Sequence, residues 1–123
     1  MKREAKFQTF FNHWLKEVRK EIFVFKLPDC GFQNPFDVFS VSANGLFSAW
    51  ELKQTQTNSL PFLSVAPHQI NALSIVKGYV VIKYPDFFCS IGINNFVKEE
   101  KESNRKSLTS ERAKEIAEIC VKI

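Results

Sequence analysis

Several kinds of site are missing from this sequence of 123 residues, because it has few of the residues that build them. Its three cysteines, Cys30, Cys89 and Cys120, include no CxxC pair, so the sequence predicts neither a disulfide framework nor a zinc site. The four glycines are spread along the chain and form no phosphate-binding loop. The sequence also shows no Ser-His-Asp or Cys-His arrangement, which argues against a hydrolase with a nucleophilic triad.

Long apolar runs are absent as well. No stretch approaches the roughly 18 consecutive apolar residues of a membrane-spanning helix. The N-terminal MKREAKFQTFF has basic residues but lacks the apolar core of a signal peptide. No internal repeat, low-complexity segment or domain linker is visible. These absences favour a single-domain protein that has no membrane partner. They also fit a reducing cytoplasm and either a cellular or a phage origin.

The abundant residues predict a domain with a preference for anions. Hydrophobic residues make up 45% of the chain and charged residues 24%, which is enough to bury a core. The formal net charge is +4 and the isoelectric point is near 9.0. Such a charge suits nucleic acid or an anionic membrane surface, and it equally suits ordinary solubility. Thirteen phenylalanines are many for this length, so some rings are expected at an interface.

Apolar periodicity and turn residues divide the chain into helices and strands. The predicted helices cover roughly 3–20, 67–77 and 108–123, and the predicted strands cover 22–27, 36–42, 46–53, 79–84 and 87–93. Residues 28–35 and 54–66 are expected as loops, and 98–107 as a mobile charged segment. The order α-β-β-β-α-β-β-α predicts a single α/β or α+β domain, with helices flanking a central mixed sheet.

Local features support these boundaries. Asn44-Gly45 predicts a tight hairpin, because both residues tolerate positive φ angles. Thr109 is expected to cap the last helix. The apolar stripe of the first helix recurs at three- and four-residue steps, at Phe7, Phe10, Phe11, Trp14 and Val18. The buried stripe of the last helix is expected at Ala113, Ile116, Ala117 and Cys120.

Three charged residues interrupt the two apolar strands of the predicted hairpin. Glu51 and Lys53 are two residues apart, so they share one face of a strand, and Leu52 points to the other face. Closing the hairpin at Asn44-Gly45 brings Asp37 next to Glu51 across the ladder. Two adjacent carboxylates raise each other's pKa unless a cation neutralises them, and Mg²⁺ prefers such oxygen ligands. The pattern therefore predicts a magnesium site with a lysine beside it.

This pattern resembles the PD-(D/E)xK nuclease superfamily, with PFD at 35–37 and ELK at 51–53. The resemblance implies a restriction-endonuclease-like fold and hydrolysis of DNA phosphodiester bonds. It also implies that Asp37 and Glu51 bind Mg²⁺, with Mn²⁺ as a possible substitute. Leu52 would add only its backbone carbonyl to the metal site, and Lys53 would serve the attacking water.

The segment SLPFLSVAPHQINAL, 59–73, is similar to a stretch of Holliday-junction resolvase-like proteins from bacteria and their phages. That similarity adds Gln69 to the catalytic residues, and FKLPDCGFQNPFD, 25–37, resembles the approach to the catalytic aspartate in the same proteins. Many members carry a glutamate on the first helix that completes the metal site. Here Gln8 occupies the expected slot, and Glu4 lies one turn earlier on the same face.

Further side chains near these motifs are candidate DNA contacts: Lys26, Thr55, Ser59, His68, Arg105 and Lys106. Each also has an ordinary structural explanation. Lys26 suits an edge strand, and the hydroxyls suit a polar loop. His68 suits a simple hydrogen bond at a helix start, and Arg105 and Lys106 suit a solvated charged segment.

The leading hypothesis is a Mg²⁺-dependent endonuclease that resolves four-way DNA junctions in recombination and repair. One alternative is a nicking or restriction-like nuclease on ordinary duplex DNA, and another is an inactive nucleic-acid-binding module of the same fold. Paired cuts in a junction call for a homodimer. Its interface is expected at 87–93 and at the apolar loop residues Leu60, Phe62, Leu63 and Val65.

Overall fold

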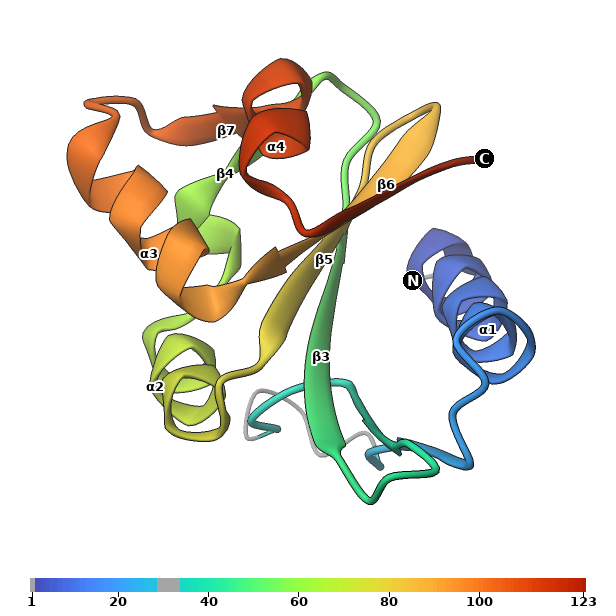
Figure 1. Ribbon diagram of the computed structural model, residues 1–123. Coiled ribbons are helices and arrows are strands. Elements are labelled where there is room, and N and C mark those ends of the chain that lie inside the picture. Colours follow the sequence, from blue (N-terminus) through green and yellow to red (C-terminus); the bar gives the residue numbers. More distant parts are fainter. Residues whose placement is uncertain (1, 29–33) are drawn as a thin grey trace.

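The computed structural model describes residues 2–28 and 34–123, with side chains from residue 6 onward (Figure 1). In these ranges the elements follow in this order: α1 (Lys2–Glu17), β1 (Phe23–Lys26), β2 (Val38–Val41), β3 (Phe47–Gln54), β4 (Ser59–Pro61), η2 (Phe62–Ser64), α2 (Pro67–Val76), β5 (Tyr79–Lys83), β6 (Phe87–Gly92), α3 (Ile93–Glu102), β7 (Ser107–Thr109), α4 (Ser110–Ile116) and β8 (Ile119–Lys122).

A mixed central sheet organises the molecule, in the strand order β1-β2-β3-β5-β6-β8. The β3–β5 pair is parallel and the other pairs are antiparallel. Helix α1 covers one face of the sheet, and α2, α3 and α4 lie on the other side (Figure 1). A small second sheet pairs β4 with β7 on the side of the three helices. The predicted fold class, a central mixed sheet flanked by helices, is confirmed.

Aromatic side chains attach α1 to the sheet. Phe11 and Leu15 are fully buried, and the Phe11 ring packs edge-on against Trp50 of β3, with 5.4 Å between ring centroids. Burial of a side chain of this size contributes about 1.5–3 kcal/mol. The prediction was wrong at two positions of this stripe, because Phe10 is 42% and Val18 63% exposed. Val18 lies beyond the last residue of the helix, so it is not part of the buried face.

The connection from α2 into β5 depends on a glycine. Lys77 ends the helix in the left-handed conformation, with φ 54°. A Cβ atom on Gly78 would lie 2.6 Å from the Leu73 side chain and 2.9 Å from the Ala49 carbonyl oxygen. Only glycine therefore allows α2 to pack this closely on β3.

The β2–β3 hairpin forms where it was predicted, with a slightly longer turn. The Ser42 amide donates to the Leu46 carbonyl and the Gly45 amide to the Ser42 carbonyl. Gly45 has a φ of +78°, whereas Asn44 is not among the residues with positive φ. The loop is thus a three-residue connection in which Gly45 alone takes the left-handed conformation.

The C-terminal third differs from the prediction. Residues 98–102, expected in a mobile charged segment, are the second half of α3, and the expected helix over 108–123 is divided into β7, α4 and β8. Thr109 does cap α4, since its hydroxyl accepts from the Arg112 amide at 3.2 Å. The helix ends because Ala117 is extended, and Ile119–Lys122 then pairs with β6. Cys120 is therefore exposed on a strand instead of buried in a helix.

Further predictions were wrong for the segments around β4 and β6. The expected loop over 54–66 contains β4 and η2. The expected dimer interface is mostly core: Leu60, Phe62 and Val65 are buried, and Leu63 is 84% exposed. Residues 87–91 are buried as well. Within the described ranges, no helix is long and apolar enough to cross a membrane.

Candidate active site

Strand β3 carries different chemistry on its two faces. Trp50 and Leu52 point to the face covered by α1, where both belong to the aromatic cluster. Glu51 and Lys53 point to the opposite face, which we call the site face. The Lys53 ammonium lies 3.2 Å from Glu51 Oε2. The predicted alternation is present, and it places a charged pair next to the α2 helix.

Asp37 reaches the same place from the neighbouring strand. The β2–β3 register pairs Val38 with Trp50, which sets Asp37 opposite Glu51. The Asp37 amide donates to the Trp50 carbonyl at 3.0 Å, and the Leu52 amide donates to Asp37 Oδ2 at 2.8 Å. These two bonds orient the Asp37 carboxylate along β3. The predicted proximity of the two acids is thus a feature of the structure.

The Glu51 carboxylate is almost completely removed from solvent, with 2% of the residue exposed. The pKa of Glu51 is raised from 4.5 to about 7, chiefly because the group is buried and in addition because of the nearby charge of Asp37. Lys53 and Gln69 act in the opposite direction, because both donate to Glu51 Oε2. A carboxylate under these conditions favours an additional cation.

Gln69 arrives from α2, 18 residues after Glu51 in the chain. Its Nε2 donates to Glu51 Oε2 at 3.0 Å, and its Oε1 accepts from the Ala66 amide at 3.2 Å. Pro67 opens the helix at a position where a backbone donor is not needed. The glutamine therefore caps α2 and orients Glu51 at the same time.

The donor set fits a magnesium ion. Glu51 Oε1 is buried without a hydrogen-bond partner among the described residues, next to a second carboxylate from Asp37. An unpartnered buried carboxylate oxygen is costly, and a hard cation with oxygen preference relieves that cost. No group of three or more histidine, cysteine or acidic side chains gathers within the described residues. The site thus offers two carboxylates rather than a larger acidic cluster.

A third acid of the predicted metal site would have to come from helix α1. Glu4, the predicted substitute for that acid, has its side chain outside the described residues. Gln8, in the slot expected for the acid, is partly buried on α1.

The predicted DNA contacts are spread over the molecule. Lys26 pairs with Val38, which faces α1, so the Lys26 side chain lies on the α1 side of the sheet. Asp37 lies on the opposite side. Thr55 donates its hydroxyl to the Ser59 carbonyl at 2.9 Å, which holds the loop before β4. His68 is exposed in the first turn of α2, one residue before Gln69.

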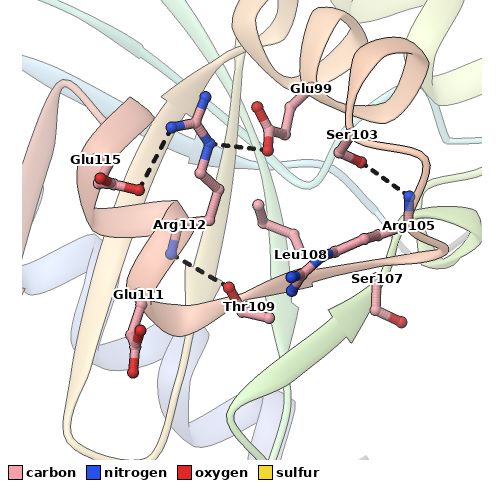
Figure 2. A pocket seen from close by; sticks show the side chains of 9 residues that line it. All are labelled: Glu99, Ser103, Arg105, Ser107, Leu108, Thr109, Glu111, Arg112 and Glu115. Atoms are coloured by element: carbon pink, nitrogen blue, oxygen red, sulfur yellow. Dashed lines mark hydrogen bonds and ion pairs between the residues drawn. The ribbon is translucent and has the colours of Figure 1, made fainter.

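Arg105 lies in a different region, beside α3, β7 and α4 (Figure 2). It lines a cavity of about 300 Å³ together with Arg112, which is paired with Glu99 at 2.9 Å and Glu115 at 3.4 Å. The three glutamates of this cavity outnumber its two arginines, which does not favour a phosphate backbone. Lys106 is exposed on the same connection, and its carbonyl accepts from the Phe62 amide.

The structure also reveals a second hollow that the sequence did not predict. It is a largely apolar pocket of about 290 Å³, formed by side chains from α1, the ends of β3 and β5, and the C-terminus: Lys6, Phe7, Phe10, Gln54, Lys83 and Ile123. Gln54 follows Lys53 on β3, and its Oε1 is buried with no partner in the part of the chain that the structure describes. No sequence spacing connects these elements, so only the packing of α1 on the sheet could have indicated the pocket.

Comparison with known proteins identifies the fold. Neither a protein-family model nor a curated protein matches this sequence. The structure is similar to that of Archaeoglobus fulgidus Hjc, a Holliday junction resolvase from an archaeal hyperthermophile, with a TM-score of 0.63 and 16% identity. The match covers 90% of this chain and 93% of that one. This chain therefore has the restriction-endonuclease-like fold that the sequence resemblance implied.

Proposed function

We propose that this protein is a metal-dependent DNA endonuclease that cuts branched DNA, with four-way junctions as its preferred substrate. The observation that carries the proposal is the buried Glu51 with an unpartnered oxygen, flanked by Asp37 and Lys53. Its position on the central strand of a fold shared with a Holliday junction resolvase supports the choice of substrate.

Each residue of the site has a role that its contacts support. Asp37 and Glu51 would hold Mg²⁺ or Mn²⁺, with the Leu52 carbonyl as a further oxygen ligand. When bound, the ion supplies positive charge for a phosphate and its leaving oxygen. Lys53 is one-fifth exposed, so its ammonium can reach a water or a phosphate oxygen from its place beside Glu51. Gln69 keeps the Glu51 carboxylate in position.

Binding of the DNA arms would rely on the phosphate backbone, which suits the net charge of +4. Lys106 and His68 are exposed and remain proposed contacts. The positions of Lys26, Thr55, Ser59 and Arg105 do not add to this proposal, because each is directed to another face, loop or cavity.

The test compares cleavage of a four-way junction with cleavage of linear duplexes of the same sequence, in Mg²⁺ and in chelator. We expect cuts in the junction only with the metal, and loss of cleavage with retained binding in Asp37→Asn. Asp86→Asn, in the exposed turn between β5 and β6, is the matched control and should cut normally. Equal cleavage of junction and duplex would replace the proposal with a nicking or restriction-like nuclease.

A second candidate function is an inactive DNA-binding module of the same fold. The presence of only two acids at the site, within the described residues, favours it. Such a module would bind a junction equally well with and without Mg²⁺ and would never cut it.

A further inference from the structure

The apolar pocket between α1 and the ends of β3 and β5, which we call the α1 pocket, lies directly behind the candidate site. Gln54, which lines it, is the residue after Lys53, so their Cα atoms are about 3.8 Å apart. Because side chains alternate along a strand, Gln54 points to the α1 face and Lys53 to the site face. Gln54 is also the last residue of β3. A molecule bound at Lys53 can therefore reach the α1 pocket around the end of this strand.

One polar atom of the α1 pocket lacks the partner that its burial requires. Gln54 Oε1 is removed from solvent and accepts no hydrogen bond within the described residues. A buried amide oxygen without a donor is costly, and a ligand that donates to it would relieve that cost. The remaining walls include the apolar side chains of Phe7, Phe10 and Ile123. The α1 pocket thus suits an apolar group that carries an N–H donor.

Phe10 gives the α1 pocket an open aromatic surface. Its ring forms a T-shaped contact with Phe88, with 6.2 Å between ring centroids, and the residue is 42% exposed. An accessible phenyl ring is a stacking surface for another flat ring. The volume of about 290 Å³ is near the lower limit of ligand pockets, so it suits a single small ring system.

Two lysines add positive charge to the α1 pocket. Lys6 is exposed, and the partly buried Lys83 donates from its ammonium to the Tyr84 carbonyl at 3.3 Å. Neither lysine forms an ion pair among the described residues, and none of the described residues that line the pocket is acidic. The cavity beside Arg105, in contrast, contains three glutamates. The charge of the α1 pocket therefore suits a ring that is joined to phosphates.

We propose that the α1 pocket binds one nucleobase extruded from the branch point of the DNA, while a neighbouring phosphate lies at Glu51 and Lys53. This inference rests on the proposed function. The extruded base would stack on Phe10 and donate from its edge to Gln54 Oε1, and the two lysines would contact flanking phosphates. Extrusion costs least where pairing and stacking are already weakened, as they are at a branch. The pocket would thus favour a branch over a continuous duplex without reading a sequence.

Fluorescence of 2-aminopurine, a base analogue that brightens when it leaves the base stack, tests the proposal. The analogue replaces each branch-point base of a four-way junction in turn, and a base inside one arm serves as the reference. Binding is measured in chelator, so that no strand is cut. The wild type should raise the fluorescence at one or more branch-point positions and leave the arm position unchanged. Phe10→Ala should lose this rise at saturating protein, whereas Ile75→Ala, which shortens an apolar side chain that is 82% exposed on α2, should keep it.

Gln54→Leu separates a binding role from a structural role, because the two effects have opposite signs. Leucine removes the buried oxygen that lacks a partner, so the variant should resist denaturant at least as well as the wild type. Its affinity for the junction should nevertheless fall by about tenfold, as should that of Phe10→Ala. Circular dichroism confirms that both variants are folded. Wild-type junction affinity in Gln54→Leu would show that the amide does not bind the DNA and would overturn the proposal.

Other outcomes would also contradict the proposal. No rise of fluorescence in the wild type, or an equal rise in Phe10→Ala, would place any extruded base outside the α1 pocket. Octanoate is a probe for a different occupant, a small apolar anion. If octanoate binds the wild type but not Phe10→Ala, and the junction does not displace it, the pocket belongs to such an anion and the proposal is wrong.

The outcome is separable from that of the proposed function, because extrusion is measured without cleavage. If the wild type cuts junctions in Mg²⁺ and Phe10→Ala gives the same fluorescence, the nuclease proposal stands and the α1 pocket proposal fails. If the fluorescence rise depends on Phe10 but no DNA is cut in Mg²⁺, the pocket proposal stands and the nuclease proposal fails. A wild type that binds no branched DNA would overturn both.

Discussion

Two buried glutamates on opposite faces of the sheet show how a candidate site differs from a structural contact. Glu21, 8% exposed, accepts from the Ser40 hydroxyl at 2.7 Å, and Ser40 accepts from the Trp50 indole at 2.9 Å. Glu51, 2% exposed, has one oxygen without a partner within the described ranges and lies next to a second acid. The first carboxylate joins the chain after α1 to β2. The second carboxylate retains an oxygen that can bind a group from outside the chain.

This difference matters because burial of a carboxylate is costly on either face. On the α1 face, the neutral Ser40 hydroxyl donates to Glu21 and is itself held by the Trp50 indole, and the Arg19 guanidinium lies 5.4 Å from the centre of the Trp50 ring. On the site face, Lys53 and Gln69 compensate only Glu51 Oε2. Hydrogen-bond partners, and not burial or residue type, therefore separate the two glutamates.

The largest expected effect comes from neutralising each glutamate in turn. Glu51→Gln should lower the rate of junction cleavage by more than about a thousandfold, because one of the two proposed metal ligands is lost. Glu21→Gln should leave the rate per folded molecule unchanged. Single-turnover cleavage measures both. If the two variants lost activity equally, the distinction between the two faces would disappear.

The pH dependence of stability sharpens the comparison without any measurement of activity. The pKa of Glu51 is raised from 4.5 to about 7, so between these values the folded protein holds a proton that the unfolded chain has released. Stability of the metal-free protein should therefore fall as pH rises through this window, by about 3 kcal/mol. Glu51→Gln should remove this part of the slope in denaturant titrations.

The same titrations test the metal directly. Above pH 7, added Mg²⁺ should restore stability to the wild type, because it binds the folded site and not the unfolded chain. Glu51→Gln should gain nothing from Mg²⁺. An equal gain in both proteins would place the ion elsewhere.

Lys53→Ala should reduce cleavage by about a hundredfold, the usual effect of an acid–base or electrostatic group. Folding should be unaffected, because the side chain faces the site and is partly exposed. A variant that unfolds but keeps its specific activity would assign Lys53 to the structure instead.

Ser40→Ala should act only on the α1 face. It removes the donor to Glu21 and the acceptor of Trp50, and both groups stay buried, so unfolding should become easier by about 1–3 kcal/mol. Cleavage at temperatures where the variant is folded should equal that of the wild type. Lower cleavage would show that the two faces are coupled through β3.

The smallest effect is expected from Gln69→Ala, at about tenfold in rate, because the amide orients Glu51 without carrying a charge. Gln69→Glu is an informative companion, since a second negative charge beside Glu51 should raise the Mg²⁺ requirement. Total loss of activity in Gln69→Ala would mean that the amide contacts the reacting groups.

The sequence by itself determined the centre of the candidate site. Strand alternation places Glu51 and Lys53 on one face, and the Asn44-Gly45 turn brings Asp37 opposite Glu51. These relations need fewer than twenty residues and two local rules, the period of a strand and the closure of a hairpin. For the same reason, the helix and strands of the first half lie close to their predicted positions.

Tertiary structure decided the remaining features, because these features depend on which elements pack against which face of the sheet. Local propensity could not show that the residues after Ala117 leave the helix to pair with β6 as β8, since that strand exists only where an edge is free to accept it. Packing of α2 made Glu51 a buried acid with a raised pKa, and the place of β1 at the end of the described sheet left Phe23 and Phe25 exposed. Burial is a property of the assembled layers, and no single segment contains it.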